Sequence, residues 1–311
     1  VENMRIAMDA VIDSGKICEG TICYTGDILN PDRSKYNLKY YVNMAKDLQS
    51  AGAHFLGLKD MAGLLKPAAA RPLVKSLKEE VGLPIHFHTH DTSGIAGATI
   101  LAAADAGVDV VDTAMDAFSG GTSQPCMGSI VEALHNSERD TGINIENLRE
   151  ISDYWGQVRA QYAAFESGLS SPASEVYLHE MPGGQFTNLK EQARSLGITT
   201  DKWGLVANMY AEVNKMFGDI IKVTPSSKIV GDMALYMITN DLSPEDVLDP
   251  NKEISFPLSV VEFFKGEIGI PMGGFPEKLQ KKILGNEKPL SKRAGSVLPN
   301  VNLDKEKENL E

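Results

Sequence analysis

The sequence has few cysteines, an excess of acidic over basic side chains and no long apolar run. Its three cysteines, Cys18, Cys23 and Cys126, form no CxxC pair and leave an odd count, which is typical of reduced, intracellular thiols. The net charge of −12 argues against nucleic acid and against an anionic membrane surface as partners, but it is compatible with a small anionic substrate at a locally positive site. No run of about 18 apolar residues is present to span a membrane, and no signal peptide is visible.

The length and composition are those of an ordinary globular protein with a sizeable core. The chain has 311 residues, of which 42% are hydrophobic and 23% charged, and this suits one large domain or two moderate ones. It opens at Val1 inside a helical pattern in which Met4, Met8, Val11 and Ile12 recur on one face. We therefore expect it to be a piece of a longer protein.

The first half of the chain alternates short apolar runs with helical patterns. Strands alternating with helices of about 10–15 residues predict βαβ units and a parallel sheet. Four such units are half of an eight-stranded barrel, so the predicted fold class is α/β: the C-terminal half of a TIM (β/α)8 barrel followed by a mostly α-helical region. The expected strands are residues 20–26, 54–60, 84–90 and 108–114, and the expected helices are residues 38–51, 67–81, 94–106 and 127–134.

From about residue 136 the pattern changes to successive helices. We expect three parts: a partial barrel core at 1–135, a helical extension at 136–290, and a polar linker or tail at 291–311. Residues 172–188, which contain the run HEMPGG at 179–184, have the composition of an irregular loop. The expected helices of the extension are residues 145–166, 189–196, 206–217, 229–239 and 260–265.

One short stretch gathers half of the chain's six histidines. In residues 84–94 (PIHFHTHDTSG), His86, His88 and His90 are two residues apart. Because side chains alternate faces along a strand, all three are expected on one face. Neutral imidazoles are the commonest metal ligands, and a strand that projects them at i and i+2 suits a divalent cation. The alternative is that they are core histidines satisfied by backbone carbonyls.

Lys59 and Asp60 end the predicted strand that precedes the histidine strand. The carboxyl ends of parallel strands carry the site in α/β proteins, so Lys59 can face the same metal. A free ammonium has no lone pair and is a poor ligand. Reaction with CO2 would convert Lys59 to a carbamate, which is a good oxygen ligand. The residues alone favour the alternative that Lys59 pairs with Asp60 or with another buried carboxylate.

Six ordered motifs resemble the carboxyltransferase domain of pyruvate carboxylase, a biotin-dependent family. The resemblance extends from Val1 to about residue 300, and six motifs in the same order make chance agreement very improbable. The motifs are residues 24–31 (YTGDILNP), 59–67 (KDMAGLLKP), 86–94 (HFHTHDTSG), 121–125 (GTSQP), 179–185 (HEMPGGQ) and 223–228 (VTPSSK).

The resemblance implies a metal centre. In this family the lysine that matches Lys59 is carboxylated and binds a divalent metal, Zn or Mn, together with the histidines that match His88 and His90. The family's remaining protein ligand is an aspartate on the first barrel strand. That aspartate and the family's pyruvate-binding arginine and glutamine have no counterpart in this sequence.

The resemblance also implies a second catalytic element at residues 223–228. Thr224 matches a threonine proposed to shuttle a proton between pyruvate and biotin, Ser227 matches a serine that contacts the biotin ureido group, and Met61 would line the pyruvate or biotin pocket. A hydroxyl suits the shuttle because it can accept and donate a proton together. Without the resemblance, residues 224–227 are a loop or helix N-cap and Met61 is a core residue.

The reaction implied by the resemblance is carboxyl transfer from carboxybiotin to pyruvate, which gives oxaloacetate. Carboxybiotin would be supplied by biotin carboxylase and biotin carrier domains, whose motifs are not found here. Two alternatives stay open: a subunit of a biotin-dependent oxaloacetate decarboxylase or transcarboxylase, and a catalytically incompetent piece that only oligomerises. The resemblance further implies a homo-oligomer, a tetramer in the family. We expect the cytoplasm as its location, with the mitochondrial matrix as the alternative.

Overall fold

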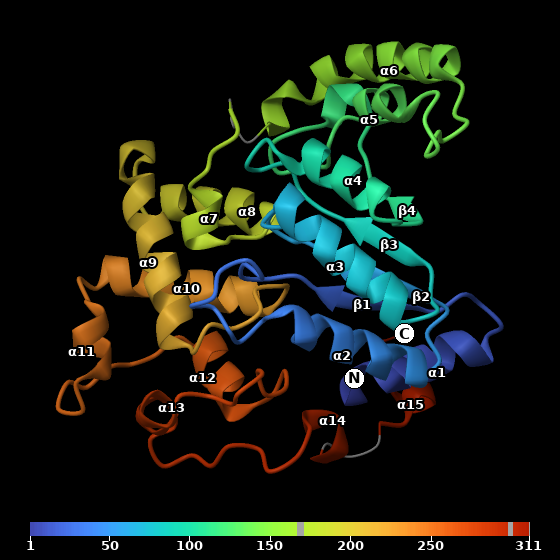
Figure 1. Cartoon of the computed structure of the whole chain (residues 1–311). Coiled ribbons are helices and arrows are strands. Elements are labelled where there is room, and N and C mark those ends of the chain that lie inside the picture. Colours follow the sequence, from blue (N-terminus) through green and yellow to red (C-terminus); the bar gives the residue numbers. More distant parts are fainter. Residues whose placement is uncertain (167–170, 298–300, 311) are drawn as a thin grey trace.

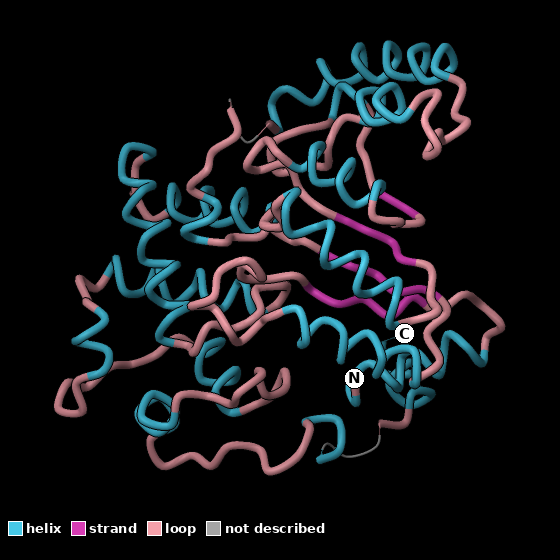
Figure 2. The backbone as a smooth tube through the Cα atoms, in the orientation of Figure 1, coloured by secondary structure: helices cyan, strands magenta, loops and turns pink. Residues whose placement is uncertain are grey.

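The computed structural model describes residues 1–166, 171–297 and 301–310, and its centre is a parallel four-stranded sheet (Figure 1). The strands lie side by side in their order along the sequence, as Figure 2 shows in magenta. All neighbouring pairs are parallel, so each strand is reached by a crossover through a helix. This arrangement confirms the predicted α/β class. The strands are β1 (Glu19–Cys23), β2 (Phe55–Lys59), β3 (Ile85–His88) and β4 (Val110–Val111).

Helices cover one face of this sheet (Figure 1). The sequence determines where they begin: Asn37 accepts a hydrogen bond from the Tyr40 amide at 3.0 Å, and Pro67 occupies the first turn of its helix. Their apolar sides join those of the strands in one hydrophobic core. The crossover helices are α2 (Leu38–Ser50), α3 (Pro67–Glu80) and α4 (Ala96–Asp105), with α1 (Glu2–Asp13) before the sheet and α5 (Met127–Leu134) after it.

The two faces of the sheet differ in polarity. Ile22, Leu56, Leu58, Ile85 and Phe87 are 0–3% exposed and form the face packed against the helices. The opposite face would be the interior of a closed barrel, and it is only partly buried. It carries the alternate residues Glu19, Thr21, Cys23, Gly57, Lys59, His86 and His88.

The second half of the chain is helical and has a hydrophobic core of its own. Within the described residues, no helix has both the length and the apolarity needed to cross a membrane. The α-helices are α6 (Ile145–Arg159), α7 (Val176–His179), α8 (Gly183–Ser195), α9 (Trp203–Met216), α10 (Ser226–Thr239), α11 (Pro244–Leu248), α12 (Leu258–Lys265), α13 (Glu277–Leu284), α14 (Ala294–Val297) and α15 (Leu303–Leu310). Short 3-10 turns lie at Asp116–Phe118, Ala160–Phe165 and Thr200–Lys202.

The structure differs from the predicted irregular loop at 172–188. Helix α7 lies inside it, and α8 begins at Gly183, six residues before the predicted start. Two adjacent glycines are typical of a turn, but here tertiary packing outweighs their low helix propensity. Gln185, Phe186 and Leu189 are all buried on the inner side of α8. Residues 167–170, within the predicted transition between helix and loop, lie outside the described residues.

Three further differences concern the length of the fourth strand and helices at places where none was predicted. The fourth strand is limited to Val110–Val111, because Ala114 leaves the sheet and forms a parallel bridge with Cys126 instead. Helices α11 and α13 lie in the extension where the sequence predicted none. The predicted polar tail contains α14 and α15, neither of which buries a residue.

Candidate functional site

Strand register places Lys59 and His88 next to each other on the polar face of the sheet. Lys59 at the end of β2 pairs with His88 at the end of β3, and paired residues of parallel strands project to the same side. Both side chains line a pocket of about 210 Å³ together with His86 and Asp112. His90 lies two residues beyond β3. Its ring packs edge to face against the ring of His88, with the two ring centroids 5.1 Å apart. The structure therefore brings Lys59, His88 and His90 together, as the sequence predicted.

The hydrogen bonds of the two histidines fix which ring nitrogens are free. His88 Nδ1 lies 2.7 Å from Asp112 Oδ2, and His90 Nδ1 lies 2.6 Å from the Thr122 carbonyl oxygen. A carbonyl and an ionised carboxylate can only accept, so both Nδ1 atoms carry the proton. In the neutral rings both Nε2 atoms then present lone pairs, and these atoms are 3.3 Å apart. Two adjacent nitrogen lone pairs of this kind can bind one cation together.

Burial and charge set the protonation of this cluster. Burial lowers the pKa of His90, and the charges of His88 and Lys59 lower it further, although its bond to Thr122 acts in the opposite direction. Burial alone would raise the pKa of Asp112, but hydrogen bonds from His86 and His88 outweigh it and hold that pKa below its usual range. His90 is therefore neutral and Asp112 ionised at neutral pH, which is the state a metal-binding imidazole requires.

His86 differs from the other two histidines of the row. Its Nδ1 lies 2.8 Å from Glu19 Oε2, and its Nε2 lies 3.0 Å from Asp112 Oδ1. Burial would lower the pKa of His86, but these two carboxylates outweigh it and raise that pKa. With both ring nitrogens facing carboxylates, His86 has no lone pair to offer a metal.

Asp60 does not pair with Lys59, which was the alternative left open by the sequence. Asp60 is fully buried and accepts hydrogen bonds from the amides of Leu64 and Leu65 at 2.8 and 2.9 Å and from Thr89 Oγ1 at 2.9 Å. Burial raises the pKa of Asp60 even though these bonds act against it. Its role is to join the end of β2 to Thr89, the residue between the two histidines. No ion pair of Lys59 is found among the described residues.

These residues fit a divalent cation as a partial ligand set. Across residues 1–166, 171–297 and 301–310, no group of three or more His, Cys, Asp and Glu side chains is placed to hold a metal. His88 and His90 supply two nitrogen donors, so the third donor from this chain would be Lys59 as a carbamate. A free Lys59 ammonium would repel the cation, whereas a carbamate would bind it.

The start of α8, in the helical region, packs against His90. The Gly183 amide donates to the Met61 carbonyl at 2.9 Å, and a Cβ on Gly183 would lie 2.7 Å from both His90 Nδ1 and the Thr122 oxygen. Gly63, at φ +73°, is equally close to the histidine segment, because a Cβ there would lie 2.2 Å from the His90 carbonyl oxygen. Gly63, in the motif at residues 59–67, and Gly183, in the motif at residues 179–185, thus permit a close approach of the backbone to His90.

Two of the predicted substrate- and biotin-side residues, Thr224 and Ser227, lie just before and within the first turn of α10, while the third, Met61, follows β2. Thr224 is exposed and lines a cavity of about 360 Å³ with apolar neighbours that include Tyr36, Phe263 and Ile270. Ser227 is 1% exposed, and its carbonyl accepts a hydrogen bond from the Tyr210 hydroxyl at 3.2 Å. Met61 is also buried, at 5% exposure.

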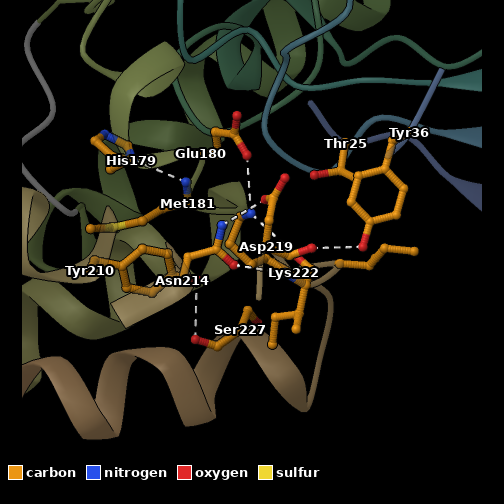
Figure 3. A network of polar contacts seen from close by, with 12 residues as sticks. Thr25, Tyr36, His179, Glu180, Met181, Tyr210, Asn214, Asp219, Lys222 and Ser227 are labelled. Atoms are coloured by element: carbon orange, nitrogen blue, oxygen red, sulfur yellow. Dashed lines mark hydrogen bonds and ion pairs between the residues drawn. The ribbon is translucent and has the colours of Figure 1, made fainter. Parts of the chain in front are cut away.

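Four charged side chains connect the β1–α2 loop, the α7–α8 loop and the segment before Thr224. We call them the bridging cluster: Arg33, Glu180, Asp219 and Lys222. Figure 3 shows Glu180, Asp219 and Lys222 close together. Glu180 pairs with Arg33 and, at 3.0 Å, with Lys222, while Arg33 also pairs with Asp219 at 3.2 Å. Burial would raise the pKa of Asp219, but the charges of Lys222 and Arg33 outweigh it and lower that pKa. The cluster joins the β1–α2 loop, the α7–α8 loop and the segment before Thr224.

Sequence reasoning missed Asp112 and the whole bridging cluster. For Asp112 a signal existed, because it follows the fourth predicted strand and must meet the other strand ends at one edge of the sheet. For the bridging cluster no local signal exists, since Arg33 and Asp219 are 186 residues apart in the sequence.

Comparison with known proteins agrees with this geometry. A family model described as a conserved carboxylase domain matches residues 176–311, and one described as HMGL-like matches residues 23–154. The pyruvate carboxylase of Bacillus subtilis (strain 168) is 52% identical over 100% of this chain. The carboxyl transferase domain of Rhizobium etli pyruvate carboxylase is 64% identical over 99% of this chain, with a TM-score of 0.98. The chain is homologous to part of this domain.

The chain matches only part of the length of these relatives. The chain spans 28% of the B. subtilis protein and 52% of the R. etli domain. The same R. etli domain has also been solved with pyruvate and biocytin, again with a TM-score of 0.98 to this chain. The family predicted from the six motifs is thereby confirmed.

Proposed function

We propose that this chain takes part in carboxyl transfer from carboxybiotin to pyruvate, which gives oxaloacetate. The observation that carries the proposal is the pair of histidine Nε2 atoms that face each other, 3.3 Å apart, beside Lys59. The similarity to an R. etli domain solved with pyruvate and biocytin, and with oxamate and biotin, supports the substrates.

His88, His90 and carboxylated Lys59 would hold a divalent metal, Zn or Mn. When bound, the metal supplies a Lewis acid that polarises the keto acid. The chain's own contribution is to orient the ligands: Asp112 and the Thr122 carbonyl fix the two imidazoles, and Asp60 fixes the backbone between them. The start of α8 at Gly183 limits access of water to His90.

Thr224 would move the proton that the reaction requires. The N–CO2 bond of carboxybiotin breaks, a C–C bond to the methyl carbon of pyruvate forms, and one proton passes from that methyl group to the biotin nitrogen. A hydroxyl can take up one proton while it releases another, and it carries no net charge in either state. The exposure of Thr224 beside an apolar cavity supports its access to biotin. Ser227 and Met61 would support the biotin and pyruvate pockets from buried positions.

The remaining partners follow from the same proposal. Biotin would arrive on a carrier domain and be carboxylated by a biotin carboxylase domain. A complete multifunctional R. etli pyruvate carboxylase is similar to this chain over 30% of its length, which supports a multidomain parent. We further propose a homo-oligomer located in the cytoplasm, with the mitochondrial matrix as the alternative.

The test is metal content with intact mass under native conditions, on the whole protein that contains this chain. We expect about one equivalent of Zn or Mn and a mass increment of one CO2, both lost in His88→Ala. His86→Ala is the matched control, because it lies on the same strand and face but has no free nitrogen. Full metal in His88→Ala, or none in the unchanged protein, would contradict the proposal.

A second assay separates the alternatives. Oxaloacetate formation from pyruvate supports the carboxylase, whereas oxaloacetate breakdown without any forward reaction would favour a decarboxylase or transcarboxylase subunit. A protein that self-associates, binds no metal and catalyses neither direction would favour the incompetent piece that only oligomerises.

A further inference from the structure

We propose that Glu180, with Arg33 and Lys222, is a positioning residue that fixes the segment carrying Thr224 relative to the histidine pair. This inference rests on the proposed function, because it takes Thr224 as the group that moves the proton and the histidine pair as the metal site. The three residues themselves touch neither the substrate nor the metal ligands. The three residues come from three separate segments and meet in the bridging cluster. Figure 3 shows two of them, Glu180 and Lys222, side by side.

The backbone of Glu180 is held in an unusual conformation. It ends α7 with φ 54° and ψ 30°, in the left-handed region that glycine normally occupies. Its amide donates to the Val176 carbonyl at 2.7 Å, and its side chain is 6% exposed. A glutamate kept in this state points its carboxylate inward, where Arg33 and Lys222 meet it.

On one side, Glu180 anchors the residues that lead to Gly183, which packs against His90. The next residues along the chain reach Met61 and His90: the Gly183 amide bonds to the Met61 carbonyl at 2.9 Å, and Gly183 packs on the His90 ring. The His179 ring adds a local constraint, since its Nδ1 accepts from the Met181 amide at 3.0 Å. A shift of Glu180 would therefore move the start of α8 that packs against His90.

On the other side, Lys222 lies two residues before Thr224. Lys222 is 1% exposed and is held between the Glu180 carboxylate at 3.0 Å and the Ile220 carbonyl at 3.3 Å. Ser226 Oγ lies 2.7 Å from the carbonyl oxygens of Ile221 and Val223, which clamps the turn around Thr224. The position of Lys222 thus sets the position of Thr224.

The paired charges of the bridging cluster explain why it links three segments of the chain and is not a binding site for a ligand. It contains two cations and two anions, and each charge has a partner. The segment around Asp219 is fixed further by hydrogen bonds to its backbone oxygen from Lys35 at 2.9 Å and from Tyr36 at 2.8 Å. A relative movement of the three segments would leave a charge buried without a partner, which is strongly unfavourable. A neutralised cluster of this kind offers no net charge to an anionic ligand.

The experiment is a double-mutant cycle between Glu180→Gln and Thr224→Ala in the whole protein that contains this chain. The measurements are kcat and KM for oxaloacetate formation, together with metal content. We expect Glu180→Gln to lower kcat about 10- to 100-fold, the effect of misplacing a reacting group by about 1 Å. KM for pyruvate should stay unchanged, and the metal content of each variant serves to correct kcat for the metal-loaded fraction. The double variant should be no slower than Thr224→Ala alone, because Glu180 acts through Thr224.

The control variant is Glu212→Gln, which breaks the exposed pair of Glu212 with Lys215 on α9 and should leave kcat unchanged. If Glu180→Gln does not fold, Arg33→Gln removes the half-buried partner of the same carboxylate and should lower kcat in the same way. Additive losses in the double variant, or an unchanged kcat in Glu180→Gln when Thr224→Ala is impaired, would overturn the inference. An unimpaired Thr224→Ala would instead overturn the proton-transfer role in the proposed function.

Discussion

Two charged groups of this molecule are built in opposite ways. The sheet-end cluster (Lys59, His88, His90 and Asp112) comes from the ends of neighbouring strands and places two histidine Nε2 atoms against each other, 3.3 Å apart. The bridging cluster comes from distant segments, and every charge in it has a partner. The comparison teaches that two metal-binding nitrogens that face each other indicate a site for a ligand, while charges from distant segments that pair with one another indicate a structural link.

The largest effect expected from this comparison is on stability. Lys222→Met removes a side chain that is 1% exposed and leaves the Glu180 carboxylate without one of its two partners. We expect the free energy of unfolding to fall by about 3–5 kcal/mol, measured by urea denaturation followed by circular dichroism. Lys215→Met is the matched control: its ion pair is largely exposed, so a loss below about 1 kcal/mol is expected. Equal losses in the two variants would show that the bridging cluster is no structural link.

The sequence predicted one of these clusters and not the other, and the reason is physical. Side-chain alternation along strands and the shared carboxyl edge of a parallel sheet are enough to predict from the sequence that Lys59 and His88 lie together. Glu180 and Arg33, by contrast, are 147 residues apart, and no periodic pattern relates them. Their meeting depends on how the helical region packs on the sheet. The early start of α8 at Gly183 has the same origin, because the tertiary packing of Gln185, Phe186 and Leu189 outweighs the low helix propensity of its glycines.

A pH scan should reveal the contribution to stability of His179, a buried histidine next to the bridging cluster. Burial lowers the pKa of His179 to about 4; the charge of Glu180 opposes this effect and that of Lys222 reinforces it. In the unfolded chain the value is about 6.5. Because the folded state favours the neutral ring, the stability from His179 is complete above about pH 6.5 and is lost as pH falls toward 4.

The expected loss is about 1.4 kcal/mol per pH unit, or about 2 kcal/mol between pH 6.5 and 5. His179→Asn keeps an acceptor for the Met181 amide but does not titrate, so its unfolding free energy should fall less over this interval. Urea denaturation at closely spaced pH values measures the difference. His135→Asn, at an exposed position, should follow the unchanged protein. Parallel curves for His179→Asn and the unchanged protein would contradict this assignment.

The smallest expected effect tests the contact between the two halves of the site. Gly183→Ala would place a Cβ 2.7 Å from His90 Nδ1 and from the Thr122 oxygen, whereas a Cβ on the adjacent Gly184 meets nothing within 4 Å. The first substitution must disturb the bond that orients His90, and losses of such orienting partners typically cost about 10- to 100-fold in metal affinity. We therefore expect Gly183→Ala to weaken metal binding by about 10-fold or more, measured by competition with a chelator, and Gly184→Ala to leave it unchanged. Both glycines lie in the same helical turn, so a change in helix propensity alone would affect the two variants equally. A difference confined to Gly183→Ala would show that the helical region completes the sheet-end cluster as well as packing against it.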